Sequence, residues 1–169
     1  MNISSLSKEF RVCQLSPNNA ETVLDLCMGN PIFYSFHPPL PTMESILEDM
    51  QALPPGKTYA DKFYIGFWKD STLVAVMDLI LDYPRESIAF IGFFMMNLRF
   101  QGTGIGSSII QDCLVYLSSI GFTSIQLGID KGNPQSEHFW AKNGFKATGR
   151  EFSDVSVSYV YMERSLSKA

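Results

Sequence analysis

The sequence contains few residues of the kinds that bind metals or form disulfide bonds. Its three cysteines, Cys13, Cys27 and Cys113, show no CxxC spacing, and it has only two histidines. Free cysteines usually behave as small buried hydrophobic residues, and two separated histidines with such cysteines do not make a metal cluster. A scattered, odd set of cysteines fits a reducing cytosol. We therefore expect no metal site and no disulfide framework, and we expect a cytoplasmic protein.

Long apolar runs and an excess of positive charge are also lacking. No apolar run approaches the roughly 20 residues that span a bilayer, and the first ten residues contain no signal-peptide core. The net charge of −4 argues against nucleic acid or an anionic membrane as the main partner. The chain has 169 residues, of which 46% are hydrophobic, so we expect one folded domain over residues 1–169.

Apolar periodicity and turn residues predict an α/β (α+β) fold with the element order β-α-α-β-β-β-α-β-α-β-β. The expected sheet is mixed and mostly antiparallel, with about seven strands and about four flanking helices. Expected strands lie at 10–15, 63–68, 73–81, 88–96, 124–129, 146–151 and 155–163. Expected helices lie at 16–28, 43–53, 105–120 and 133–143, and the strand at 124–129 is expected to run parallel to 88–96.

The segment 31–41 contains four prolines, and it is expected to lack regular structure. Its side chains are nevertheless too apolar for an idle loop. Phe33 and Tyr34 either pack over the edge of the core or form a wall of a substrate pocket. His37 is either an exposed loop residue or a group that reaches the same pocket. We therefore treat Phe33, Tyr34 and His37 as candidate substrate-binding residues.

Three glycines lie within five residues of the segment Arg99–Ser107 (RFQGTGIGS), between an apolar strand and a helical pattern. Such a turn exposes backbone N–H groups at the positive end of a helix and therefore attracts anions. A P-loop is excluded because no lysine follows Gly106. A dinucleotide fingerprint is disfavoured because Ser107 replaces its third glycine and the preceding strands are antiparallel. A phosphate-bearing ligand, bound mainly by main chain, is the remaining inference.

Two segments resemble the signatures of the GNAT acetyltransferase superfamily. The turn QGTGIG (101–106) is similar to its Q/R-x-x-G-x-G/A motif, and the segment Asn133–Phe145 resembles its N-x-x-A-x-x-x-Y-x-x-x-G-F motif. The resemblance implies transfer of an acetyl group from acetyl-CoA to a primary amine of a small molecule or peptide by direct attack. It also implies coenzyme contacts from residues at the strand end, the glycine turn and the later helix: Phe94, Met95, Met96, Gln101, Gly102, Thr103, Gly104, Ile105, Gly106, Ser107, Asn133, Ser136 and Trp140.

The catalytic groups are less clearly marked. Trp140 stands where many members of the superfamily have a tyrosine, and an indole N–H is a donor but not a usable acid. Asp78 interrupts an apolar strand, so it is either bonded to backbone or a hydroxyl, or it faces the cleft to recognise an amine or accept a proton. Tyr161 is a weaker candidate, and the backbone N–H of Met96 is expected to stabilise the oxyanion. His138 is about 160° from Trp140 around the helix and is expected to point away.

Two alternatives stay open at this level. The missing tyrosine suggests a non-catalytic acyl-CoA-binding or sensor domain on the same fold. A second alternative is an acyltransferase that uses a hydroxyl acceptor or a longer acyl chain. The aromatic content, at 13% of the residues, makes a homodimer a further expectation.

Overall fold

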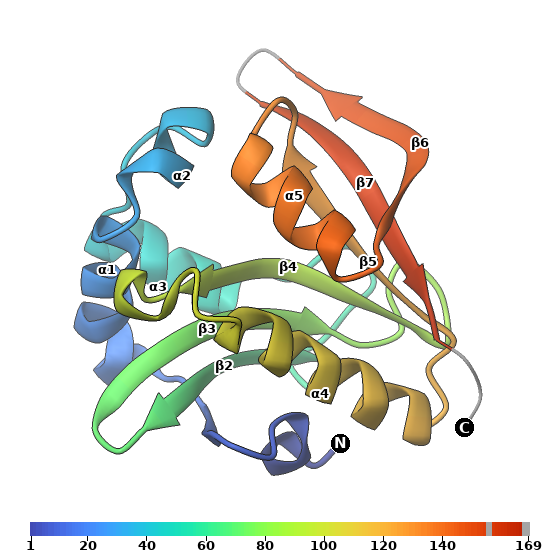
Figure 1. Ribbon diagram of the computed structural model, residues 1–169, viewed down its shortest axis with the longest axis horizontal. Helices are drawn as coiled ribbons and strands as arrows, with labels where there is room; N and C mark the ends of the chain where they lie inside the picture. Colours follow the sequence, from blue (N-terminus) through green and yellow to red (C-terminus); the bar gives the residue numbers. More distant parts are fainter. Residues whose placement is uncertain (155–156, 167–169) are drawn as a thin grey trace.

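The computed structural model describes residues 1–154 and 157–166, and a seven-stranded sheet runs through them (Figure 1). The strand order is β1-β2-β3-β4-β5-β7-β6, and β4 with β5 is the parallel pair among antiparallel neighbours. The mixed sheet and its parallel crossover are therefore confirmed. Its strands are β1 (Arg11–Gln14), β2 (Lys62–Lys69), β3 (Thr72–Ile80), β4 (Ile88–Met96), β5 (Ser124–Asp130), β6 (Lys146–Ser153) and β7 (Ser158–Ser165). The expected start of the last strand, at 155, lies outside the described residues.

The described part of the chain contains five α-helices, and four of them lie where the sequence predicts helices. These are α1 (Ala20–Met28), α3 (Met43–Gln51), α4 (Ile105–Ser119) and α5 (Pro134–Lys142). The fifth, α2 (Pro31–Phe36), corrects the expectation that 31–41 lacks regular structure. Pro31 occupies the first turn, where its missing N–H costs no intrahelical bond, and the other prolines follow the helix. No helix in the described ranges is long and apolar enough to cross a membrane.

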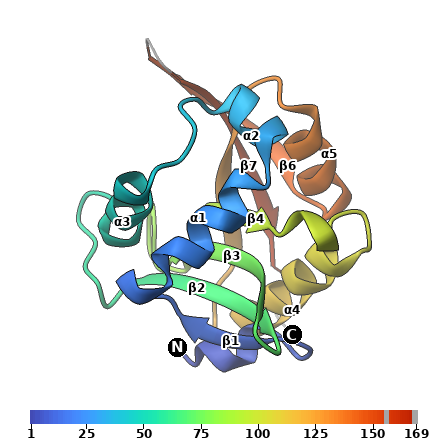
Figure 2. The same cartoon turned by 90° about the vertical axis from the view of Figure 1, so that its left-hand side faces the viewer.

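The sheet separates two hydrophobic cores because successive residues of a strand point to opposite faces. On β3, Met77 and Leu79 belong to the core that also contains the buried face of α4. Val76 belongs to the second core, which contains α1 and Ile46 of α3. In Figure 2, α1 crosses in front of β2 and β3, and α4 lies beyond these strands. Helices therefore cover both faces of this part of the sheet.

The parallel pair of strands separates halfway along its length. Ladder pairing of β4 with β5 extends only from Ile88–Ser124 to Ile91–Leu127. Beyond this point β5 and β7 diverge from β4, which continues beside β3 (Figure 1). A register shift in β3–β4 falls at the same level, between Asp78 and Leu79. The second half of β4 therefore has an edge that β5 does not cover.

Candidate active site

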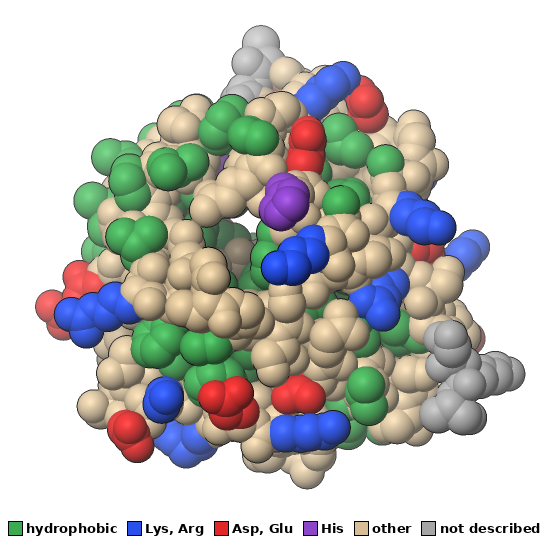
Figure 3. Space-filling model, viewed as in Figure 1, with side chains coloured by type: hydrophobic (Ala, Val, Ile, Leu, Met, Phe, Trp, Pro, Cys, Tyr) green, Lys and Arg blue, Asp and Glu red, His purple; other side chains and the backbone are tan. Residues whose placement is uncertain are grey.

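A cavity of about 870 Å³ lies where β4 and β5 diverge. This volume is within the range of small-molecule and cofactor sites, and Figure 3 shows an opening near the centre of the corresponding face. Most of the predicted site residues line it: Phe33, His37, Asp78, Phe94, Met95, Met96, Gln101, Gly102, Gly104, Gly106, Ser107, Ser136, Trp140 and Tyr161. The cavity wall does not include Tyr34, Thr103, Ile105 or Asn133.

Main-chain groups at the end of β4 face this cavity. The N–H of Asn97 donates to the carbonyl of Val74 on β3, 2.8 Å away. Because bonding alternates along an antiparallel pair, the main-chain groups of Phe94 and Met96 point to the opposite side, which β5 has left. The carbonyl of Met96 accepts hydrogen bonds from Asn30 Nδ2 (3.1 Å) and Gln101 Nε2 (3.2 Å). The N–H of Met96 stays the predicted oxyanion donor.

The glycine turn presents an open, positively polarised surface. Gly102 and Gly104 have φ angles of 73° and 87°, a region that glycine adopts without strain. A Cβ at either position would meet no atom within 4 Å, so open space lies beside both. The first turn of α4 has free N–H groups, no acidic side chain and no side-chain cap at Gly104. These features fit a diphosphate at the helix N-terminus.

Asn133 caps the start of α5, and Gln135 connects this helix to the glycine turn. Asn133 Oδ1 accepts from the N–H groups of Gln135 (3.1 Å) and Ser136 (3.2 Å), and thereby caps the helix. Its buried Nδ2 has no hydrogen-bond partner among the described residues. Gln135 Nε2 donates to Gln101 Oε1 at 3.2 Å. Gln135 therefore holds the start of α5 beside the glycine turn, whereas Asn133, which is 0% exposed and outside the cavity wall, serves as the cap of α5.

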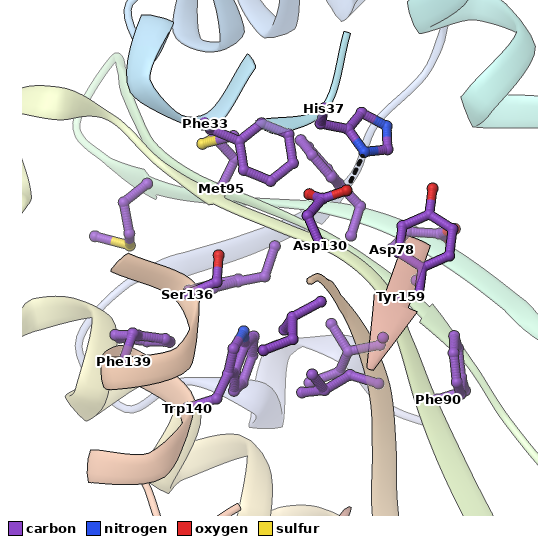
Figure 4. Close-up of a pocket in the computed structure, with 18 of the residues that line it drawn as sticks. Phe33, His37, Asp78, Phe90, Met95, Asp130, Ser136, Phe139, Trp140 and Tyr159 are labelled. Atoms are coloured by element: carbon purple, nitrogen blue, oxygen red, sulfur yellow. Dashed lines mark hydrogen bonds and ion pairs between the residues drawn. The ribbon is translucent and has the colours of Figure 1, made fainter. Parts of the chain in front are cut away.

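Trp140 belongs to an aromatic cluster at the base of the cavity. It is 7% exposed, and its ring makes edge contacts with Phe94, Phe139 and Phe145 at centroid distances of 5.9, 5.0 and 4.9 Å. Its indole nitrogen points toward the cavity (Figure 4). The side chain is thus a core residue that also lines the cavity.

Asp78 lies in the cavity wall and forms an ion pair that was not expected from the sequence. Lys62 Nζ donates to both carboxylate oxygens, at 2.8 and 2.7 Å. The partner is therefore a lysine on β2, and not backbone or a hydroxyl. Burial raises the pKa of Asp78, and the charge of Lys62 acts in the opposite direction. The sequence carried no local signal for this pair, because Lys62 and Asp78 lie on different strands and meet only through the register of β2 with β3.

His37 lies at the other side of the cavity and contacts Asp130, a residue that sequence reasoning missed. His37 Nδ1 lies 2.9 Å from Asp130 Oδ1 (Figure 4). Asp130 is the last residue of β5 and is 5% exposed. The hydrogen bond to Asp130 raises the pKa of His37, and burial of the ring opposes this. Its position as a polar residue at the carboxyl end of a parallel strand is the signal that could have found Asp130.

The remaining candidates are placed as follows. His138, which was expected to point away from the site, lines the cavity. Tyr161 lies on β7, with the guanidinium of Arg150 5.0 Å from its ring centroid. Tyr34 packs edge-on against Phe33 at 5.0 Å, in the core on the α1 side. Thr103 donates its hydroxyl to the carbonyl of Phe100 at 2.6 Å. Within 1–154 and 157–166, no group of three His, Cys, Asp or Glu residues could hold a metal ion.

Comparison with known proteins assigns the family. The model of the acetyltransferase (GNAT) family matches residues 30–145, which is more than half of the chain. The protein therefore belongs to the GNAT acetyltransferase family. Among curated proteins, no sequence relative is found.

Solved structures show the same fold at low sequence identity. An acetyltransferase from Thermus thermophilus is 19% identical, with a TM-score of 0.73 over 92% of this chain and 96% of that one. A PaiA N-acetyltransferase from Thermoplasma acidophilum, in complex with coenzyme A, is 18% identical, with a TM-score of 0.67 over 91% and 97%. Ard1 from Thermoplasma volcanium is 19% identical, with a TM-score of 0.68 over 94% and 99%.

Proposed function

We propose that the protein is an acetyl-CoA-dependent N-acetyltransferase that acetylates a primary amine of a small molecule or peptide in the cytoplasm. This proposal rests on one observation: the open glycine turn at the start of α4 and the uncovered edge of β4 line the same cavity. The turn supplies N–H groups for a diphosphate. The strand edge supplies main-chain groups that pair with the amides of an extended arm.

This chain's residues would act mainly by positioning. Acetyl-CoA supplies the acetyl group as an activated thioester. The main chain of Phe94 and Met96 orients the arm beside β4, and the N–H of Met96 is the proposed donor to the developing oxyanion. Ser136 and Trp140 bound the cavity on the α5 side. Holding amine and thioester together in this way removes most of the entropic cost of their encounter.

The acceptor approaches from the side of α2 and α3. The cavity wall contains three carboxylates, those of Asp49, Asp78 and Asp130, and the cations of Lys142 and Arg150, while Lys62 pairs with Asp78. Asp49 and Asp130 form no ion pair with a lysine or arginine among the described residues, which favours a cationic amine over an anionic acceptor. Phe33 and Phe93 provide an apolar surface beside these charges, with ring centroids 6.1 Å apart.

The test combines binding with turnover. Calorimetric titration with acetyl-CoA is expected to show saturable binding, and thiol release is expected on addition of at least one amine from a panel of amines. Absence of acetyl-CoA binding would contradict the proposal.

Trp140 supports one second candidate, a non-catalytic acyl-CoA-binding domain, because its indole does not protonate a leaving thiolate. Acetyl-CoA binding without thiol release on any amine of the panel would favour that candidate.

A further inference from the structure

His37 and Asp130 form a contact across the cavity between two segments that are 93 residues apart in sequence. His37 follows the last residue of α2, and Asp130 ends β5, on the far side of the gap between the diverging strands. Both side chains line the cavity. The pair therefore stands at the place where an acceptor amine would meet a thioester lying along β4.

The imidazole is held in one orientation by three neighbours. Its Nδ1 is 2.9 Å from Asp130 Oδ1. The ring of Phe33 stacks against it at 5.3 Å with an interplanar angle of 29°, and Tyr159 lies at 6.2 Å and 35°. A carboxylate that accepts from Nδ1–H fixes the tautomer in which Nε2 carries the lone pair. The His37 side chain keeps 37% exposure, so Nε2 can exchange protons with solvent.

Asp78, the carboxylate predicted from the sequence as a candidate, is less suited to accept a proton. Both of its oxygens accept from Lys62 Nζ at 2.8 and 2.7 Å, so its charge is already compensated. Asp130 is likewise engaged by His37. Nε2 of His37 makes no hydrogen bond within residues 1–154 and 157–166, so it is the better proton acceptor among these three side chains.

We propose that His37 is the proton acceptor in acetyl transfer and that Asp130 is the positioning residue that orients its ring; this rests on the function proposed above. One N–H proton of the acceptor ammonium moves to Nε2, and the freed nitrogen lone pair forms the C–N bond to the thioester carbonyl carbon. The C–S bond then breaks, and its electron pair leaves on sulfur. A second N–H proton ends on the thiolate, and His37 returns its proton to water.

The charges around His37 set the expected pH dependence. Asp130 from β5 and Asp49 from α3 both raise the pKa of His37, while burial lowers it. The Tyr159 hydroxyl on β7 is neutral in this range, since burial raises its own pKa. Only the neutral imidazole accepts a proton, so activity is expected to rise with pH through a pKa above the ordinary value of about 6.5.

The experiment is the pH profile of kcat/KM, measured with one amine for the wild type and three variants. The His37→Asn amide can still donate to Asp130 from near the Nδ1 position but cannot accept the proton. This variant is expected to have a kcat/KM about 100-fold lower than the wild type and to lose the rise of kcat/KM with pH that depends on His37. Asp130→Asn is expected to move the rise to lower pH, because it removes the charge that raises the pKa of His37. His138→Gln changes the other histidine, which also lines the cavity, and is expected to keep the rise in place. Loss of the rise in this variant would contradict the role of His37.

The outcomes separate the two proposals. A wild-type protein that acetylates no amine contradicts the proposed function, and the role of His37 with it. An active wild type whose His37→Asn variant keeps both rate and pH rise contradicts the role of His37 alone. Rescue of a His37→Ala variant by free imidazole, with acetyl-CoA affinity unchanged, supports proton acceptance and excludes a purely structural role. An Asp130→Asn profile that coincides with the wild type overturns the positioning role.

Discussion

Gly92 on β4 lies directly beside the carboxylate of Asp78 on β3. A Cβ at position 92 would stand 2.9 Å from Asp78 Oδ2, closer than side-chain atoms normally approach. The ladder shifts register at this level, with Asp78 paired to Phe93 and Leu79 to Ile91. Glycine therefore leaves the space in which the carboxylate lies, facing the cavity and paired with Lys62.

The Lys62–Asp78 pair predicts a large effect of removing one partner. Lys62 is 5% exposed, so Asp78→Asn leaves a buried ammonium without a counter-charge. We expect the free energy of unfolding to fall by about 3 kcal/mol in urea titrations. The double variant Lys62→Met/Asp78→Asn is expected to recover most of this loss, because no buried charge remains. Equal stability of the wild type and Asp78→Asn would show that the pair contributes nothing.

Alanine substitutions at two glycines, one at each end of α4, distinguish the effect of backbone strain from an effect on acetyl-CoA binding. Gly104 begins the helix with φ 87°, and Gly121 follows its end with φ 101°; a Cβ at either position would meet no atom within 4 Å. Alanine at either position costs about 1 kcal/mol of strain. Only Gly104→Ala is expected to weaken acetyl-CoA binding, by about tenfold or more, since its Cβ obstructs approach to the backbone. Calorimetry that finds equal affinity for both variants would contradict the assignment of the turn.

Trp140 can be tested with two variants that differ by one hydroxyl. Trp140→Tyr and Trp140→Phe remove the same indole from the aromatic cluster and are expected to lose similar stability. If the site lies at the thioester sulfur, the tyrosine variant keeps or raises turnover relative to wild type, because its hydroxyl can protonate a thiolate. Thiol release at saturating acetyl-CoA measures this. A folded Tyr variant that binds the coenzyme normally but turns over far more slowly would assign a role to the indole itself.

The His37–Asp130 pair also predicts how stability varies with pH. Asp130 raises the pKa of His37 above its unfolded value. The stability that this pair contributes to the folded protein is therefore fully present below about pH 6.5. It is lost as the pH rises through the pKa of His37 in the folded protein. We expect the Tm of the wild type to exceed that of Asp130→Asn at pH 5.5, and the difference to shrink at pH 8.5. A difference that is constant or grows with pH would contradict the pairing.

The sequence predicts those parts of the fold that depend on local patterns. The apolar run of β4 matches Ile88–Met96 at both ends, and the glycine turn appears where three glycines follow a strand. The same locality explains the error at α2, since proline is unfavourable inside a helix but suits its first turn. The four-proline segment gave no indication of which position Pro31 would occupy.

The contacts at the acceptor side depend on tertiary placement and lack a local signal. His37 and Asp130 are in contact only because the fold brings the end of α2 to the end of β5. No neighbouring residue in the sequence predicts this contact. Lys62 and Asp78 are diagonal neighbours across β2 and β3, and their pairing needs the strand register. Sequence motifs mark the proposed coenzyme side of the cavity, whereas the proposed acceptor side consists of segments that the fold brings together.

Acetyl transfer to an amine is tested most directly by following an isotopically labelled acetyl group from acetyl-CoA to an acceptor. The wild-type protein is incubated with labelled acetyl-CoA and a panel of primary amines, and the products are identified by mass spectrometry. We expect at least one amine to be converted to an amide that carries the label, with one free thiol released for each amide formed. Saturable acetyl-CoA binding with no label in any amide would contradict this expectation.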